Sequence, residues 1–242
     1  MEPSGMPDAA ALDLAPSPPS RLLNAFAGCP DAMFQQEQLT DNFDSLMVLN
    51  ANWDWKNDGR FPPPMLSNGA LAFGPDNLDP TQWWNNWTPL TSLVTYGDVL
   101  YCVHYLITPA SGEPIGDNDF ETSVRGDSDT SMALALQPDE SVAILHTRTS
   151  TADTEHGRVA LPFNLDVQQT VEVAMWAHGN HYYTEIKNLD SGQVAALSVD
   201  YSMVPTQGNV GMLGWRLKNA LYVNRAVVGS PGTMASAILA DK

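Results

Sequence analysis

The chain has 242 residues and a formal net charge of −17, from 11 Lys and Arg residues against 28 Asp and Glu residues. This charge repels phosphate backbones and anionic lipid headgroups, so it argues against nucleic acid and acidic membranes as partners and leaves neutral glycans, cations and basic surfaces. The length suits one generous β domain, because β-sandwiches commonly exceed the usual domain size without dividing.

The N-terminal part differs in composition from the rest of the chain. Residues 2–20 are small, acidic and rich in proline, and such a segment cannot bury enough apolar surface to order itself. We expect residues 1–36 to form a disordered tether and a strap. Within it, Arg21–Phe26 forms either a short turn of helix or an extended strap that lays apolar side chains on the folded body. A tether of this kind is typical of the residues that follow the lipidated cysteine of a bacterial lipoprotein, and an ordinary disordered tail is the alternative.

The sequence predicts no membrane-spanning segment. No apolar run approaches the roughly 20 residues that cross a bilayer, and the N-terminus lacks the basic-then-apolar order of a secretory signal. Charged residues make up only 16% of the chain, whereas Asn, Thr, Ser and Gln are plentiful, a composition typical of exported proteins. We therefore expect an extracytoplasmic protein, either secreted or held at the outer surface as a processed lipoprotein.

From about Phe43 to Val228 the sequence reads as a series of short alternating strands. The segment Gly97–Thr108 is rich in β-branched and aromatic residues and is stopped by Pro109. Residues Phe120–Arg125 alternate between apolar and polar side chains, which indicates a strand with one face in the core and one in solvent. Further strands are expected at residues 70–73, 132–136, 142–146, 171–176, 181–186, 194–199, 208–213 and 220–228.

Several short motifs accompany these strands. They are Asp41–Asp44 with Trp53 behind it, Asn68–Leu71, Ala177–Tyr183 with Ile186–Asn188, and Gly208–Met212 followed by Ala220–Asn224. The motifs and the order of elements resemble the concanavalin A-like lectin/glucanase and laminin G-like jelly rolls. In that group a similar final pair of strands returns to the sheet that contains the first strand. The fold hosts lectins, glycosidases, adhesion modules and inert scaffolds, so the resemblance concerns fold and not activity.

The strand series and the resemblance together give a domain prediction. We expect residues 37–230 to form an all-β, two-sheet antiparallel jelly-roll sandwich of roughly a dozen strands. Residues 231–242 are expected to form a short C-terminal tail.

Tryptophan residues are the best sequence indication of a ligand. Trp83, Trp84 and Trp87 lie in a segment rich in turn residues, and Trp55 completes this candidate ligand-binding set. Sugar rings stack their apolar C–H faces on exposed indoles, while Asn, Asp and Gln bind their hydroxyl groups. The alternative is that these indoles enter or cap the core. Core positions are expected for Trp53, Trp176 and Trp215.

The segment Asp117–Glu121 is the nearest approach to a catalytic motif. Glucanases of the superfamily that the chain resembles carry Glu-x-Asp-x-x-Glu on a strand, which places a nucleophile and an acid on one face. Asp119 and Glu121 share a face here if the segment is extended, although the motif starts with Asp117 instead of Glu. The alternative is a solvated strand edge.

The same acids are candidate ligands of Ca²⁺, which accepts six to eight oxygen atoms in flexible geometry. The candidates are Asp117, Asp119, Asp127 and Asp129. No twelve-residue ligand loop that ends in a bidentate Glu is present, and Asp-rich turns arise by chance in a chain this acidic.

The two cysteines, Cys29 and Cys102, lie far apart and lack the close spacing of a zinc site. A disulfide between them would join the end of the tether to a central strand. The alternative is that Cys102 is a buried thiol and Cys29 a free one.

Three remaining motifs carry less information. His178 and His181 bracket an expected turn and could converge on a metal, but no third ligand is apparent. His156 lies in an expected loop at residues 153–157. Arg125–Asp127 matches the integrin-recognition tripeptide, and so short a match is expected by chance.

These observations lead to three hypotheses of function. The first is an exported, non-catalytic module that binds a glycan or another cell-surface component through a tryptophan-bearing edge. The second is a glycoside hydrolase or lyase on the same scaffold, using Asp119 and Glu121. The third is a structural or adhesion module whose sandwich face binds protein. We expect the first.

Overall fold

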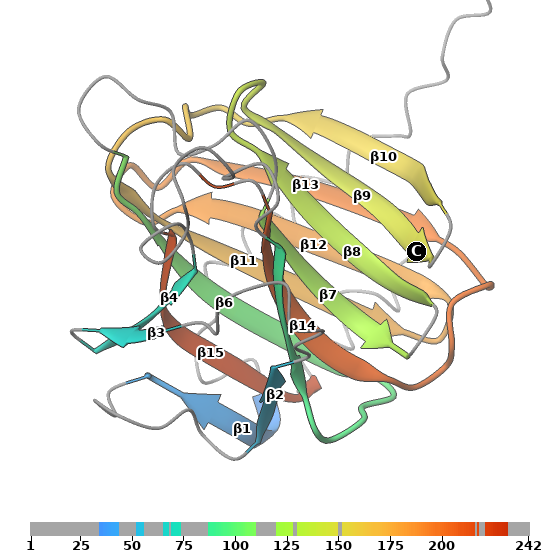
Figure 1. Cartoon of the computed structure of the whole chain (residues 1–242). Coiled ribbons are helices and arrows are strands. Elements are labelled where there is room, and N and C mark those ends of the chain that lie inside the picture. The colour runs from blue at the N-terminus through green and yellow to red at the C-terminus, as the bar shows by residue number, and fades with distance from the viewer. Residues whose placement is uncertain are drawn as a thin grey trace, which may run out of the picture.

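A computed structural model shows the chain as two layers of antiparallel strands (Figure 1). It describes residues 34–43, 52–55, 65–67, 69–73, 87–109, 120–127, 130–149, 152–215, 217 and 221–231. Every regular element within these residues is a β-strand, which confirms the predicted all-β sandwich. The described part contains no helix long and apolar enough to cross a membrane.

The larger layer, sheet A, has eight strands in the order β13-β12-β11-β6-β15-β4-β3, and β1 also pairs with β15. These strands are β1 (Phe34–Asp41), β3 (Met65–Ser67), β4 (Ala70–Phe73), β6 (Val99–Ile107), β11 (Gln169–His178), β12 (His181–Asn188), β13 (Val194–Asp200) and β15 (Leu221–Pro231). Strands β11, β12 and β13, which match expected strands, follow one another in both the chain and the sheet, because tight turns join them.

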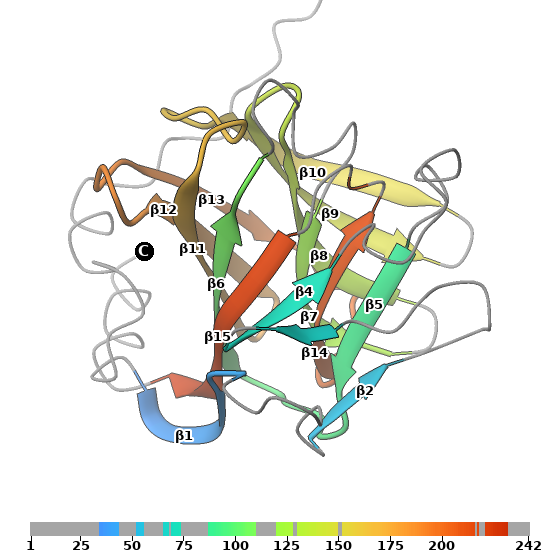
Figure 2. The same ribbon diagram turned by 60° about the vertical axis from the view of Figure 1, so that its left-hand side comes forward.

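The second layer, sheet B, has seven strands in the order β10-β9-β8-β7-β14-β5-β2. They are β2 (Trp53–Trp55), β5 (Trp87–Ser92), β7 (Phe120–Gly126), β8 (Thr130–Gln137), β9 (Val142–Thr149), β10 (Asp153–Ala160) and β14 (Asn209–Trp215). Figure 2 shows the layers turned toward their edges, with β6, β11 and β12 of sheet A to the left of β8, β9 and β10 of sheet B. The outer face of each sheet is the side turned away from the other sheet.

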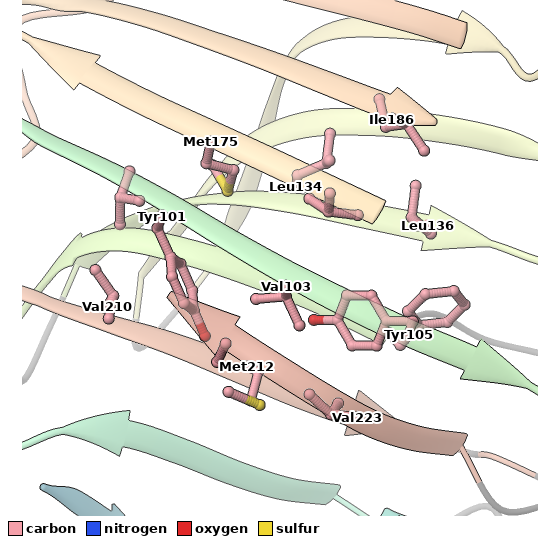
Figure 3. Packing of buried hydrophobic residues seen from close by; sticks show 14 of the residues in the cluster. Tyr101, Val103, Tyr105, Leu134, Leu136, Met175, Ile186, Val210, Met212 and Val223 are labelled. Carbon is pink, nitrogen blue, oxygen red and sulfur yellow. The ribbon is translucent and has the colours of Figure 1, made fainter. Parts of the chain in front are cut away.

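The core lies between the two sheets and is filled by alternate side chains of their strands (Figure 3). From β6, Tyr101, Val103 and Tyr105 enter it, and from β8, Leu134 and Leu136 enter it from the other layer. Each of these five side chains is at most 1% exposed. The period-two pattern read in the sequence therefore marks the inner face of each strand.

The motif at Asp41 closes the first described strand onto the core. Its Oδ1 accepts a hydrogen bond from the Phe43 amide at 2.8 Å, and its Oδ2 accepts one from Trp53 Nε1 at 3.0 Å. Phe43 and Trp53 are both buried, with ring centroids 6.3 Å apart. The carboxylate satisfies the indole N–H, which allows Trp53 to lie in the core as predicted.

The structure corrects two expectations about strands. Residues 153–157, expected as a loop, belong to β10, so His156 lies in a strand. Because β10 is an edge strand with mostly exposed side chains, it lacks the apolar alternation that reveals inner strands. The expected last strand pair is also wrong, since β14 belongs to sheet B and β15 to sheet A. Alternation records which side chains are buried and not which strand is the neighbour.

One further difference concerns the first part of the chain. Strand β1 begins at Phe34, inside the segment expected to be tether and strap. It pairs with β15, so the last strand does return to the sheet of the first. Of the tail expected over 231–242, Pro231 is the last residue of β15, and residues 232–242 lie outside the described residues.

Gly208 marks a close approach between two segments of backbone. A Cβ at this position would lie 2.4 Å from the Gly126 carbonyl oxygen and 2.5 Å from the Arg125 carbonyl carbon. Gly208 also exchanges two backbone hydrogen bonds with Tyr96, of 2.7 and 2.9 Å. The backbone therefore cannot move away from the added atom without weakening these bonds.

We predict that Gly208→Ala lowers the free energy of unfolding by about 1–3 kcal/mol, because the added methyl group overpacks the site. Urea denaturation measures the change. Gly97→Ala is the matched control, since its Cβ would meet only Thr206 O at 3.7 Å, an ordinary contact. It should change the free energy by no more than about 1 kcal/mol, and equal losses in the two variants would contradict the explanation.

Candidate functional site

Three ionisable side chains lie together on the outer face of sheet B. Phe120 and Val124 of β7 face the core, so strand alternation turns Glu121 outward. Strand β8 separates β7 from β9, and across it Glu121 Oε1 lies 2.6 Å from Arg148 Nη2 and 3.5 Å from His146 Nε2. Glu121 and His146 are both buried.

Arg148 joins two carboxylates. Its Nη2 contacts Glu121, while its Nε donates to Asp153 Oδ1 of the edge strand β10 at 3.3 Å. The Glu121 contact is an ion pair that lacks hydrogen-bond alignment. Exposure of the side chains rises from 3% at Glu121 to 23% at Arg148 and 48% at Asp153, so the group runs from the sheet to solvent. We call Glu121, His146, Arg148 and Asp153 the Glu121 cluster.

Apart from His146 and Arg148, the described neighbours of Glu121 on the same face are small or apolar. Ala135 of β8 and Leu213 of β14 lie directly opposite it in the two adjacent strands. Ser123 follows it on β7, and a Cβ on Gly211 would lie 2.8 Å from Ser123 Oγ. Glu121 thus has a guanidinium and an imidazole beside it, and these neighbours supply no second carboxylate.

The structure describes two of the four tryptophans predicted to bind a ligand, Trp55 and Trp87. Trp83 and Trp84 lie outside the described residues. Trp87 begins β5, where its backbone is opposite that of Trp215 in β14. Trp55 is half-buried and packs against the core, and its Nε1 is closed to solvent without a hydrogen-bond partner in the described part. Trp55 therefore lies at the edge of the core, as in the alternative to ligand binding that the sequence left open.

Of the four acids predicted as Ca²⁺ ligands, the structure describes only Asp127. Asp117, Asp119 and Asp129 lie outside the described residues. Asp127 is exposed, and its Oδ1 accepts a hydrogen bond from the Thr130 amide at 2.7 Å, which stabilises the β7–β8 turn. Within the part of the chain that the structure describes, no group of three or more His, Cys, Asp or Glu side chains could hold a metal ion.

Arg125 belongs to a second polar cluster, at the end of the sandwich. Its Nη2 donates to Asp98 Oδ1 at 3.0 Å, and its Nε donates to the Gly97 carbonyl at 2.9 Å. The guanidinium also lies over the Tyr182 ring, 5.4 Å from its centroid. Because the side chain is only 2% exposed, the Arg125–Asp127 tripeptide cannot be presented to an integrin.

His178 and His181 have separate aspartate partners. His178 Nδ1 lies 2.6 Å from Asp98 Oδ2, and His181 Nδ1 lies 2.7 Å from Asp200 Oδ1. The Gly179 amide also donates to Asp98, at 3.1 Å. These contacts tie the β11–β12 turn to its neighbours on both sides and account for the two histidines without a metal.

Cys102 lies on the outer face of sheet A, is 2% exposed and is disulfide-bonded. Cys29 lies outside the described residues, so its pairing with Cys102 stays a prediction. Trp176 is buried as expected, but on this outer face and not between the sheets.

The fold is similar to those of known lectins, although no protein-family model and no curated protein matches the sequence. The metal-free exoplasmic/lumenal domain of VIP36 is similar with a TM-score of 0.61 and 10% identity, covering 81% of this chain and 94% of that chain. Lectin II from Ulex europaeus gives 0.54 and 10%, over 80% and 99% of the two chains. Peanut lectin gives 0.53 and 11%, over 78% and 96%. The chain has a concanavalin A-like jelly-roll fold.

At such low identity the comparison establishes the fold alone. What this concanavalin A-like sandwich can bind must therefore be argued from its own side chains. Sequence reasoning missed Arg148 and Asp153 as site residues. The two-residue spacing of His146 and Arg148 on β9 indicated a shared face, but only the pairing of β7, β8 and β9 brings that face to Glu121.

We predict that Arg148→Met lowers the free energy of unfolding by about 3 kcal/mol, because it leaves the buried Glu121 carboxylate without its cation. Adding Glu121→Gln should recover much of the loss, since the uncompensated charge is then removed. Urea denaturation of both single variants and the double variant measures the coupling.

The control is Arg158→Met. Arg158 makes exposed ion pairs with Glu140 and Glu155, of 3.0 and 3.1 Å. Its loss should cost no more than about 1 kcal/mol. Similar losses for Arg148→Met and Arg158→Met would show that the Glu121 pair is not the buried interaction described above.

Proposed function

We propose that this protein is an exported, non-catalytic carbohydrate-binding module that recognises neutral glycans at the outer face and rim of sheet B. The fold supports the proposal. One VIP36 exoplasmic/lumenal domain of the same fold was solved with Ca²⁺ and Man3GlcNAc, and the lectin UEA-II was solved with galactose. The Glu121 cluster supplies the argument from this chain's own residues.

The position of Arg148 is the observation that favours binding over hydrolysis. A glycoside hydrolase places two carboxyl groups about 5–9.5 Å apart, on either side of the bond that it breaks. In the Glu121 cluster the Arg148 guanidinium contacts both Glu121 and Asp153, so it takes up the space between these carboxylates. A sugar could reach the exposed ends of Arg148 and Asp153 but not the gap between the two acids.

The charge of the site favours neutral sugars. The cluster has two carboxylates and one guanidinium, in a chain whose net charge is −17, so uronates, sialates and sulfated glycans are repelled. Arg148 can donate a hydrogen bond and Asp153 can accept one. Neighbouring hydroxyl groups of a hexose both donate and accept, which matches this pair.

Aromatic stacking is the second part of the proposal. Trp87 belongs to β5 of sheet B, the sheet that carries the Glu121 cluster. We keep Trp83, Trp84 and Trp87 as the proposed stacking residues, because sugar C–H faces bind exposed indoles and this segment is rich in Asn.

We predict saturable binding of the full chain to a neutral glycan on an array of neutral and acidic glycans. Asp153→Asn should weaken binding about tenfold, because the amide weakens both the contact with Arg148 and the acceptor offered to the sugar. Trp87→Ala should also weaken binding. The matched control is Glu140→Gln, which removes a carboxylate of similar exposure outside the cluster. Absence of binding to any glycan, or tighter binding to acidic than to neutral glycans, would contradict the proposal.

The array should be run in Ca²⁺ and in EDTA, because three of the four candidate acids lie outside the described residues. Loss of binding in EDTA would assign Ca²⁺ to the site. Unchanged binding would exclude it from recognition.

The hydrolase hypothesis is tested separately with Asp119 and Glu121. It requires the release of reducing ends from β-glucans, abolished by Glu121→Gln. We expect no release by the unmodified chain, since Glu121 is held by Arg148.

A further inference from the structure

Strand β13 is an edge of sheet A that lacks the usual features that prevent pairing with another chain. Sheet edges are kept free by short strands, charged side chains, proline residues or bulges. The edge strands β2 and β3 have three residues each, and β1 and β10 contain charged residues and breaks in register. Strand β13 has seven residues in unbroken register with β12, and its only charged residue is Asp200 at its end. Among the described edges, β13 is therefore the one best suited to accept a further strand.

The backbone of β13 alternates between groups that are bonded to β12 and groups that point away from it. Asn188 N donates to Gln193 O at 2.9 Å, and Tyr201 N donates to Asn180 O at 2.8 Å. Bonded pairs recur at every second residue of an antiparallel ladder, so every second residue from Gln193 to Tyr201 is bonded to β12. The residues whose N–H and C=O groups point away from β12 are Val194, Ala196, Ser198 and Asp200.

The core is incompletely covered beside this edge. Among the described residues, six apolar side chains are half-buried against the main core, and four of them lie where β10 and β13 end the two sheets (Figure 1). They are Val159 of β10, Leu197 and Val199 of β13, and Tyr201, which follows β13. We call these four residues the edge group. The Tyr201 ring lies 4.1 Å from the ring of His156 in β10, so the two edge strands are close neighbours. A strand added beside β13 would turn alternate side chains toward the edge group.

Charge indicates which kind of strand the edge would accept. The Asp200 side chain is 85% exposed, although His181 Nδ1 lies 2.7 Å from its Oδ1. Asp190, in the turn between β12 and β13, is also exposed, and Lys187, opposite Val194, is half-buried. A second copy of the chain would bring a further charge of −17 and be repelled, whereas a basic segment is attracted.

We propose that β13 binds an extended basic segment of a partner protein as an additional antiparallel strand of sheet A. The segment exchanges backbone hydrogen bonds with the outward groups of β13. Its apolar side chains pack on the edge group, and its Lys or Arg side chains lie on the other face, the face to which Asp200 points. The backbone bonds supply affinity and the side-chain alternation supplies specificity. This surface includes no residue of the Glu121 cluster, so the proposal goes beyond glycan binding and is independent of it.

Amide hydrogen exchange of the full chain, followed by NMR, tests whether the edge is open. In the free protein the amides of Ala196 and Ser198 should exchange at least about tenfold faster than those of Leu197 and Val199, which are bonded to β12. Slow exchange of Ala196 and Ser198 in the free protein would overturn the proposal, because a second copy or another part of the chain would then occupy the edge.

A synthetic peptide of the length of β13, with alternating Lys and Val residues, is the probe for binding. The labelled peptide should bind saturably in fluorescence anisotropy, and it should slow exchange at Ala196 and Ser198. A peptide of alternating Glu and Val should not bind, because the chain repels it. Equal binding of the Lys and Glu peptides, or no binding of the Lys peptide, would contradict the proposal.

Methylated peptides test the hydrogen bonds without altering the protein. Opposite residues of antiparallel strands share a face, so the Lys residues of the bound peptide pair with Ala196 and Ser198. Methylation of the Lys backbone nitrogens should abolish binding, whereas methylation of the Val nitrogens, on the far edge of the peptide, should leave it unchanged. The reverse result, or equal effects of the two modifications, would overturn the proposed pairing.

A matched pair of proline variants tests which edge is used. Ala196→Pro removes an outward N–H and should weaken peptide binding at least about tenfold. Ala160→Pro is the control, because Ala160 is exposed on β10 and its N–H also points away from the neighbouring strand, as the bond from Leu161 N to Ser141 O shows. Ala160→Pro should bind the peptide as the unmodified chain does. Equal losses in the two variants, or a loss in Ala160→Pro alone, would overturn the assignment to β13.

Discussion

Burial of β6 on both of its faces is the constraint on which the rest of the structure depends. Its inner residues, such as Tyr101 and Tyr105, require sheet B as a partner layer. Its outer residues, such as Leu100 and Cys102, are also at most 2% exposed. A strand that is buried on both faces carries apolar side chains in both directions, which explains why the sequence of β6 is almost continuously apolar.

The few cations of the chain are used to neutralise carboxylates at key positions. Only 11 of the 242 residues are Lys or Arg. Arg148 contacts the buried Glu121, and Arg125 contacts Asp98 where β6 begins. Glu121 is buried, so Arg148 compensates a carboxylate that water cannot reach. Asp98 is partly exposed and also contacts His178 and the Gly179 amide. The formal net charge of the chain remains −17, which agrees with the proposal of neutral sugars as ligands.

The fold and the proposed function of this protein rest on different observations. The concanavalin A-like architecture follows from structural similarity at about one tenth identity, which carries no residue correspondence. The proposed glycan binding depends instead on the guanidinium of Arg148, which lies between two carboxylates. Any scaffold that placed these side chains in the same way would offer a sugar the same groups.

The sequence by itself determined which residues face the core and where the inner strands lie. Alternation is strong wherever one face is buried, so β6, β7 and the succession from β11 to β13 could be predicted, whereas the exposed edge strand β10 could not. The tertiary structure alone decided that β14 and β15 belong to different sheets and that Arg148 reaches Glu121 across β8. The physical reason is that side-chain periodicity is a local property, whereas strand order and register depend on contacts between distant segments.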